Sequence, residues 1–373
     1  MKKFISIVVI VIVAAMTFNC TKAKGYTIKG TVVGAADGDT VSLIEGRGNE
    51  MEVLANAVVK NGKFTITGEQ DSTRLLFLSY VSNDMQRNAT ASLFVENAEI
   101  LVTLNPDSAV ADVRGTHANE IWTAFARHNE QRSSVGMKAF YASIDTAATP
   151  EARKAAKEQL DAIEAELTDF YKDFIQTNRD NVVGQFVLAS YAEQLEDEDF
   201  VKAQLDAIDM QKAIPAVRRL KQLKDIQAET AVGKPYKDIT AETPGTEILS
   251  VSNFVGRQGV KLLMIDFWAS WCGPCRAEMP NVKAVYERFH SQGLEILGVS
   301  LDNDEDDWRE AIDQMDMTWP QISDLCGWES AGAAAYGVRA IPATVLIKDG
   351  IIVARNVRGA ELAKKVEELL QQD

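Results

Sequence analysis

The chain has 373 residues, of which 46% are hydrophobic and 25% charged, a globular composition that suggests two or three domains rather than a disordered chain. The formal net charge of −15 argues against nucleic-acid binding, because proteins that bind a phosphate backbone need clustered positive charge. Four cysteines are too few for a disulfide framework, and three histidines far apart in sequence offer no local pattern of metal ligands.

The first twenty residues have the pattern of an export signal. Two lysines precede an almost wholly apolar run over 4–16, which is too short to span a membrane and fits the core of a signal peptide. Cys20 follows in a placement that resembles bacterial lipoprotein signals, in which this cysteine becomes the lipidated N-terminus. The alternative is ordinary cleavage after Ala15 or Ala23. We expect a protein of the cell envelope, facing the periplasm, that contacts a membrane only through a lipid anchor.

Residues 26–115 predict an antiparallel β domain, either a sandwich or a partial barrel. Short segments with alternating apolar side chains are separated by turn residues throughout this stretch. Asn61-Gly62 stands between segments 57–60 and 63–67, and this pair is typical of a two-residue hairpin because it accepts the positive φ of a type I′ turn. No group of side chains in this domain indicates catalysis.

Residues 116–230 change to a helical period and predict a central helical domain. One helix starts near Pro150, and its apolar stripe consists of Leu160, Ile163, Leu167, Phe170 and Phe174. The stripe could form a coiled-coil seam between chains, but a seam needs three or four heptads. Packing within the same chain is therefore the favoured interpretation.

Residues 234–373 alternate buried strands with amphipathic helices and predict an α/β domain, a mixed sheet with helices on both faces. A short hairpin is expected over 236–249. The strands expected after it are 261–268, 294–300, 344–347 and 351–355, and the helices are 272–291, 307–315 and 361–371.

The motif with the clearest chemistry is Cys272-Gly273-Pro274-Cys275. A zinc site would need two further ligands, and the sequence offers no second pair of cysteines or histidines, so we expect no metal. Cys272 falls where a buried strand turns into a helix, and the helix N-terminus favours its thiolate. Cys275, one turn later, can reach Cys272 to form a disulfide that is readily reduced and reformed. Both observations indicate a redox pair.

Residues 234–373 resemble the thioredoxin-fold disulfide reductases of the TlpA/ResA type, whose active-site motif matches 271–275. The resemblance implies that Asp266 relays a proton to the resolving cysteine, and its place in an apolar run should raise its pKa. Glu278 matches an active-site glutamate of the ResA-like branch, the alternative being an ordinary surface residue.

The same resemblance implies a substrate-binding edge beside the dithiol. Trp271 precedes the first cysteine of the motif. Pro342 matches a proline that is cis in the family, and the backbone of Ile341 would pair with the substrate chain. The alternative for Pro342 is a trans proline at the start of an edge strand.

The N-terminal ninety residues are similar to the DUF4369 type of β domain, which precedes thioredoxin-like domains in lipoproteins of Bacteroidetes. That similarity implies no catalytic residues, and the central helices resemble nothing specific.

Two further features are expected to have no role in catalysis. The acidic run 302–307 lacks the glycine and glutamate of a calcium loop and is interpreted as the capped start of the next helix. Cys326 is interpreted as a buried, inert thiol. A regulatory or mixed-disulfide site, and a partner for the active pair, are its alternatives.

The sequence therefore predicts an exported thiol-disulfide oxidoreductase that reduces disulfides of envelope proteins through Cys272 and Cys275. It needs no bound cofactor, because an upstream dithiol would donate the electrons. A peroxiredoxin-like peroxidase is one alternative, although Ile265 and Ala269 replace the proline and threonine that hold peroxide in that branch. The other alternative is an envelope binding protein with vestigial redox activity.

Overall fold

The computed structural model of the protein describes residues 25–47 and 50–372. The predicted signal segment 1–20, with Cys20, lies outside the described residues. Across the described part of the chain, no helix combines the length and the apolar character needed to cross a membrane. The chain divides between Ile214 and Pro215 into two compact units, an N-terminal unit and a C-terminal unit.

The N-terminal unit begins with two four-stranded sheets that share one apolar core. One sheet has the spatial order β4 (Lys63–Gly68), β1 (Tyr26–Val32), β7 (Glu99–Leu104) and β8 (Asp112–Arg114). The other has the order β3 (Glu50–Val58), β2 (Thr40–Arg47), β5 (Arg74–Val81) and β6 (Asn88–Val95). Buried and exposed side chains alternate along β4 and β7, as expected for strands with one face on a core. The predicted β domain is confirmed.

One strand pair differs from the predicted antiparallel arrangement. β1 pairs in parallel with β7, with Ile28 opposite Ile100 and Val32 opposite Leu104. The other strand pairs described in these two sheets are antiparallel. Strands β2 to β6 separate β1 from β7 along the chain, so no short turn fixes the relative direction of this pair.

The Asn61-Gly62 turn forms as predicted, but the strands on either side of it belong to different sheets. Asn61 and Gly62 have φ angles of 51° and 68°, the positive values of a type I′ turn. Lys60 and Lys63 exchange backbone hydrogen bonds of 2.9 and 3.0 Å. Beyond this bridge β3 pairs with β2 and β4 pairs with β1. The turn therefore links the two sheets instead of closing a hairpin within one.

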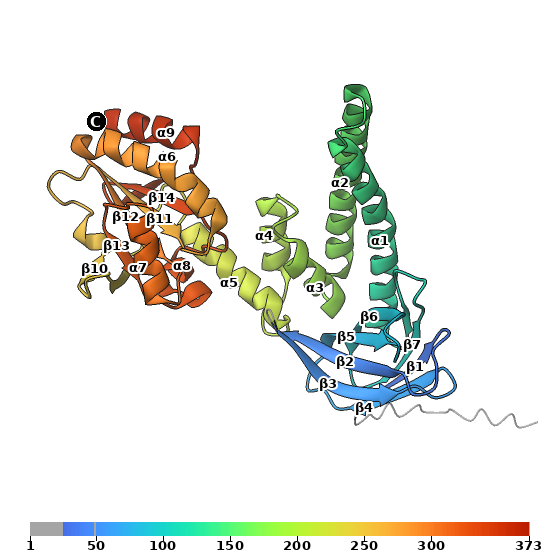
Figure 1. The fold of residues 1–373 in the computed structure, drawn as a ribbon. Helices are drawn as coiled ribbons and strands as arrows, with labels where there is room; N and C mark the ends of the chain where they lie inside the picture. Colours follow the sequence, from blue (N-terminus) through green and yellow to red (C-terminus); the bar gives the residue numbers. More distant parts are fainter. Residues whose placement is uncertain (1–24, 48–49, 373) are drawn as a thin grey trace, which may run out of the picture. The chain divides into compact units, whose positions relative to one another are not determined.

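Helices complete the N-terminal unit: α1 (His117–Ile144), α2 (Pro150–Asn178), α3 (Val182–Tyr191) and α4 (Glu198–Ala207). The first two lie alongside each other (Figure 1). Phe125 of α1 contacts Phe170 and Phe174 of α2, with ring centroids 5.4 and 4.7 Å apart. The apolar stripe of α2 thus packs within the same chain, as the favoured interpretation held.

The C-terminal unit is built on a seven-stranded mixed sheet. Its spatial order is β10 (Ile248–Ser250), β9 (Thr240–Glu242), β13 (Gln321–Ser323), β12 (Leu294–Ser300), β11 (Leu262–Trp268), β14 (Ala343–Lys348) and β15 (Ile351–Arg355). The central strand β11 is parallel to β12 and antiparallel to β14. All side chains of β11 and β12 are buried, because helices cover both faces of the sheet.

The helices of this unit are α5 (Pro215–Glu229), α6 (Gly273–Phe289), α7 (Glu305–Gln314), α8 (Ala331–Ala335) and α9 (Ala360–Gln371). Short 3₁₀ turns occur at Val251–Asn253, His290–Gln292 and Gly327–Glu329. In Figure 1, α6 and α9 lie together on one face of the sheet, with α7 and α8 on the other. This is the expected α/β arrangement.

Helix α5 belongs to the C-terminal unit, although its helical period predicted that it is part of the central helical domain 116–230. The side chain of Gln227 donates to the carbonyl of Gly337 at 3.2 Å. Arg355 of β15 donates to the carbonyl and to the hydroxyl oxygen of Thr230, at 2.7 Å each. These contacts join residues that are far apart in sequence. Helical periodicity alone therefore could not show that α5 belongs to the unit that contains the seven-stranded sheet.

Candidate active site

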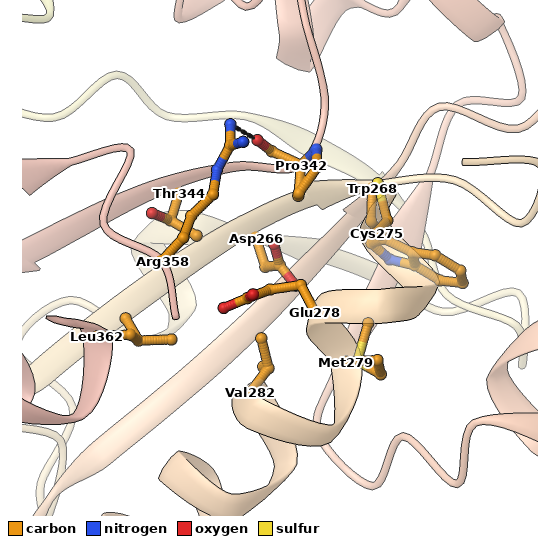
Figure 2. A pocket seen from close by; sticks show the side chains of 10 residues that line it. All are labelled: Asp266, Trp268, Cys275, Glu278, Met279, Val282, Pro342, Thr344, Arg358 and Leu362. Carbon is orange, nitrogen blue, oxygen red and sulfur yellow. Dashed lines mark hydrogen bonds between the residues drawn. The ribbon is translucent and has the colours of Figure 1, made fainter. Parts of the chain in front are cut away.

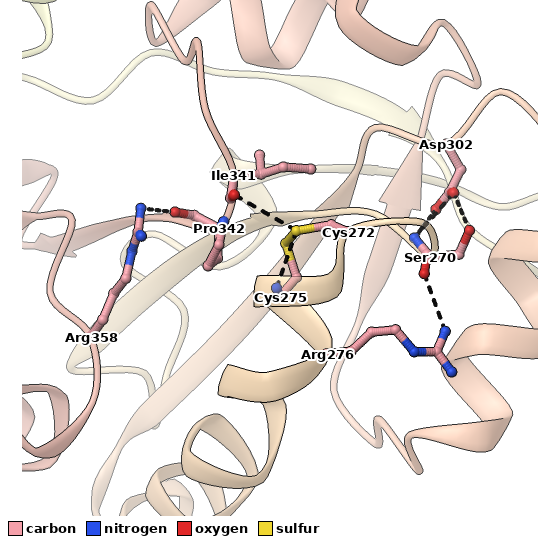
Figure 3. The surroundings of a disulfide bond; sticks show 8 residues. All are labelled: Ser270, Cys272, Cys275, Arg276, Asp302, Ile341, Pro342 and Arg358. Carbon is pink, nitrogen blue, oxygen red and sulfur yellow. Dashed lines mark hydrogen bonds between the residues drawn. A yellow bond between two sulfur atoms is a disulfide. The ribbon is translucent and has the colours of Figure 1, made fainter. Parts of the chain in front are cut away.

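The dithiol lies where β11 turns into α6. Cys272 is the N-cap residue of α6, and Cys275 lies in its first turn. Their sulfurs form a disulfide, and the backbone N–H of Cys275 donates to Cys272 Sγ at 3.1 Å (Figure 3). Unpaired N–H groups and the helix dipole stabilise negative charge at this position. The local geometry therefore favours a nucleophilic Cys272 thiolate once the disulfide is reduced.

Ile341 and Pro342 lie beside the dithiol because of the strand register. β14 runs antiparallel to β11 with Ala343 opposite Phe267, so the start of β14 adjoins the end of β11. The carbonyl oxygen of Ile341 is 3.7 Å from Cys272 Sγ (Figure 3). The peptide bond between Ile341 and Pro342 is cis. Both residues are thus placed next to Cys272.

Asp266 places a carboxyl group within the central strand β11. Its side chain is 2% exposed and lines a small cavity together with Cys275 (Figure 2). Burial raises the pKa of Asp266 to about 7, the negative charge of Glu278 adds to this increase, and Arg358 opposes it. The cavity has about 10 Å³ for the centre of a water molecule, enough for roughly one. Asp266 can therefore exchange a proton near neutral pH.

Glu278 faces the same cavity from α6 and also has a structural role (Figure 2). Its carboxylate accepts hydrogen bonds from the side chain of Asn281 and from the backbone N–H of Gly359, each at 2.7 Å. Gly359 is the N-cap residue of α9, so Glu278 ties α6 to the start of α9. The carboxylate of Glu278 is half-buried and held in place, unlike that of an ordinary surface glutamate.

Arg358 is a member of this site that the sequence analysis did not identify. Its guanidinium group lines the cavity and donates to the carbonyl of Pro342 (Figure 2). The residue lies in the connection between β15 and α9, outside any recognisable motif. Arg358 reaches the cavity beside Cys275 because β15, which it follows, lies two strands from β11 in the sheet.

A second unpredicted group holds the turn that precedes Cys272. The buried carboxylate of Asp302 accepts from the backbone N–H of Ser270 at 3.0 and 3.1 Å and from its hydroxyl at 2.6 Å (Figure 3). The hydroxyl of Ser300 donates to the same carboxylate at 2.7 Å. Asp302 belongs to the acidic run that was interpreted as a helix start. Only Asp304 of that run caps α7, through the N–H groups of Asp306 and Asp307.

Trp271 and Cys326 lie on the surface. The indole of Trp271 contacts that of Trp328, which the sequence analysis did not single out. The prediction that Cys326 is buried is wrong: the residue is exposed and forms no disulfide. It starts the short 3₁₀ turn Gly327–Glu329, and no apolar periodicity covers such a turn.

Two family models match the chain. Residues 232–355 match the AhpC/TSA family, and residues 26–122 match a domain of unknown function, DUF4369. The first match contains the dithiol and all seven strands of the C-terminal sheet. The second contains the two sheets of the N-terminal unit and the start of α1.

Individual relatives are thiol-disulfide oxidoreductases. ResA of Oceanobacillus iheyensis is 32% identical over 131 residues, which make up 33% of this chain and 67% of that protein. ResA of Bacillus thuringiensis is 30% identical over 112 residues, 30% of this chain and 62% of that protein. Among solved structures, the thioredoxin domain of a thiol-disulfide oxidoreductase from Bacteroides vulgatus is 30% identical, with a TM-score of 0.35, and the match covers 38% of this chain and 99% of that one.

The peroxidase alternative gains no support from these relatives. Ile265 and Ala269, which stand where a peroxidase has proline and threonine, are fully buried apolar residues. This chain combines a dithiol with a cis proline and a buried aspartate. The relatives that it matches are named as thiol-disulfide oxidoreductases. Through its C-terminal unit the chain belongs to the ResA-like thiol-disulfide oxidoreductases of the thioredoxin fold.

Proposed function

We propose that the protein reduces disulfide bonds in proteins of the cell envelope. The observation that carries this proposal is the Cys272–Cys275 disulfide at the N-terminus of α6, with the N–H of Cys275 directed at Cys272 Sγ. A disulfide closed by cysteines three residues apart can be opened and reformed without unfolding the domain around it. The reduced form would carry two electrons for a substrate disulfide.

The first step is attack by Cys272. Its thiolate attacks one sulfur of a substrate disulfide, the substrate S–S bond breaks, and the first substrate thiolate leaves. Cys272 is then bonded to the second substrate sulfur in a mixed disulfide. The carbonyl of Ile341, 3.7 Å from Cys272 Sγ, lies where the backbone of the bound substrate could pair with it.

The second step releases the reduced substrate. Cys275 transfers its proton to the carboxylate of Asp266, directly or through one water in their shared cavity, and becomes a thiolate. This thiolate attacks Cys272 Sγ, which forms the Cys272–Cys275 bond and expels the second substrate thiolate. The substrate gains two electrons and the protein loses two. An upstream dithiol then returns the protein to its reduced form, without a bound cofactor.

Export and lipid attachment at Cys20 complete the proposal. They rest on the basic start, the short apolar run and the position of Cys20 in the sequence. Labelling cells with a fatty-acid analogue tests the anchor, because Cys20→Ser should abolish labelling and release the protein from the membrane fraction. Unchanged labelling of Cys20→Ser would contradict lipidation at this residue.

Substrate trapping tests the reaction. Cys275→Ser keeps the attacking sulfur and removes the resolving one, so it should accumulate mixed disulfides with envelope proteins that dithiothreitol releases. Cys272→Ser is the matched control and should capture none. If Cys275→Ser reacted with small disulfides but captured no protein, the proposed substrate class would be wrong.

The reduction potential tests the direction of electron flow. A reductase should have a potential near that of thioredoxin, about −270 mV, whereas strong oxidants such as DsbA lie near about −120 mV. Equilibration of the dithiol with glutathione buffers gives the value. A potential close to that of DsbA would contradict reduction and indicate an oxidase of envelope proteins.

A further inference from the structure

An exposed pair of tryptophans lies next to the dithiol. Trp271 and Trp328 are each 51% exposed, with ring centroids 6.1 Å apart and planes at 55°. The other tryptophans of the C-terminal unit, Trp268, Trp308 and Trp319, are buried. Large aromatic side chains left together in solvent beside a reactive group are typical of a binding surface, since each can bury a large apolar area.

A single buried residue holds both loops that carry these rings. The carboxylate of Asp302 fixes the backbone and the hydroxyl of Ser270, next to Trp271. The backbone carbonyl of Asp302 accepts from the N–H of Gly327, next to Trp328, at 3.4 Å. The loops that carry the two indoles are therefore tied to the same residue, so binding need not order the backbone of these loops first.

The position of the pair identifies what would occupy it. Trp271 directly precedes Cys272, the sulfur that a substrate must reach, so residues beside the substrate's cysteine come close to the indoles. Trp271 is already part of the substrate-binding edge that the resemblance implies. We propose that Trp328 extends this edge, so that the two indoles together bind a large apolar side chain that flanks the reacting cysteine of a polypeptide disulfide, and that Trp328 sets the preference for such substrates. The identity of the occupant rests on the proposed function, whereas the binding surface can be tested without it.

A binding experiment tests the surface independently of redox chemistry. The full chain with Cys272→Ser and Cys275→Ser cannot react, and it is titrated with two reduced peptides that differ only in phenylalanine or serine beside their cysteine. Indole N–H resonances report each tryptophan. The phenylalanine peptide should shift the resonances of Trp271 and Trp328 but not those of the buried tryptophans, and the serine peptide should shift none. If neither exposed indole responded, the binding surface would be refuted whether or not the protein reduces disulfides.

A kinetic experiment tests the role of Trp328 in selectivity. Matched cyclic peptide disulfides with phenylalanine or serine beside the reacting cysteine are reduced by the wild-type protein, and the ratio of the two kcat/KM values is measured. We expect a ratio above one that falls roughly five- to tenfold in Trp328→Ala, as for an interface side chain whose truncation costs about 1 kcal/mol, and is largely kept in Trp328→Phe. Ile248→Ala, which truncates an exposed side chain on the edge strand β10, should leave the ratio unchanged.

The outcomes separate this inference from the proposed function. An unchanged ratio in Trp328→Ala, or no preference in the wild type, would refute the role of Trp328. Reduction of small disulfides without reduction of either peptide would instead refute the proposed substrate class, and the binding experiment would still decide whether the surface exists.

Discussion

Asp266 is the residue whose burial has the clearest energetic consequence. Burial, together with the negative charge of Glu278, raises its pKa to about 7, although Arg358 opposes the increase. The unfolded chain would ionise this carboxyl group near pH 4. Between these two values the folded protein holds a proton that the unfolded chain has lost. Stability therefore falls as the pH rises from about 4 to 7, and the full penalty applies above pH 7.

Asp266→Asn removes this penalty and should stabilise the oxidised protein at high pH. A pKa displaced from near 4 to about 7 corresponds to at most about 4 kcal/mol. We expect the gain in the free energy of unfolding to be largest at pH 8, to shrink as the pH falls through 7, and to vanish near pH 4. Urea denaturation at several pH values measures it. Asp313→Asn, on the exposed side of α7, controls for the removal of one negative charge. A gain independent of pH would contradict the argument.

The same carboxyl group predicts the pH dependence of the second chemical step. Asp266 accepts a proton from Cys275 only when it is ionised, so the rate of mixed-disulfide resolution should rise with pH through about 7. Asp266→Asn should lose this rise and slow resolution at pH 7 by roughly tenfold or more. Single-turnover kinetics with a peptide disulfide measure the step.

Glu278 and Arg358 shift the pKa of Asp266 in opposite directions, so variants of these two residues form a pair of controls. Because the charge of Glu278 raises the pKa of Asp266, Glu278→Gln should move the midpoint of the pH–rate profile to lower pH. Arg358 lowers this pKa, so Arg358→Gln should move the midpoint to higher pH. If the two variants shifted the midpoint in the same direction, Asp266 would not be the group that titrates.

The turn between β11 and α6 depends on the carboxylate of Asp302, which lies two residues after the end of β12. Asp302→Ala leaves the half-buried donors of Ser270 and the buried hydroxyl of Ser300 without their acceptor, which should cost about 3 kcal/mol of unfolding free energy. Asp304→Ala, from the same acidic run, removes only a helix N-cap and should cost about 1 kcal/mol. Denaturation curves of the two variants give the comparison. Equal losses would mean that the Asp302 contacts add nothing beyond an exposed cap.

The elements that could be predicted from the sequence are those determined by local patterns. Strand and helix periods placed β11, α6 and α9 within a few residues, and the Cys-x-x-Cys spacing placed the dithiol. Arg358 and Trp328 could not be predicted, because their contacts depend on strand order and on loops that carry no periodic pattern. The Asn61-Gly62 turn shows the same limit. Its φ angles follow from two residues, but the sheet that each flanking strand joins is set by distant partners.

The residue at which the C-terminal unit starts determines how stable an isolated fragment of this unit will be. Arg355 is partly buried, and burial lowers its pKa. Its guanidinium group donates to the carbonyl and hydroxyl oxygens of Thr230 and to the carbonyl of Tyr336, at 2.7 Å each. A domain cut at the predicted residue 234 would keep the Tyr336 acceptor and lose both Thr230 acceptors.

We therefore expect fragment 215–373 to be more stable than fragment 234–373, although both retain the complete sheet and the dithiol. Two lost hydrogen bonds to a charged group correspond to about 3 kcal/mol, and the contact between Gln227 and Gly337 is lost as well. Denaturation of both oxidised fragments measures the difference. In fragment 234–373, Arg355→Met should recover part of the loss by removing a charged group that has lost two of its three acceptors. In fragment 215–373 the same substitution should destabilise. Equal stabilities of the two fragments would show that α5 contributes nothing to this unit and would restore the boundary at 234.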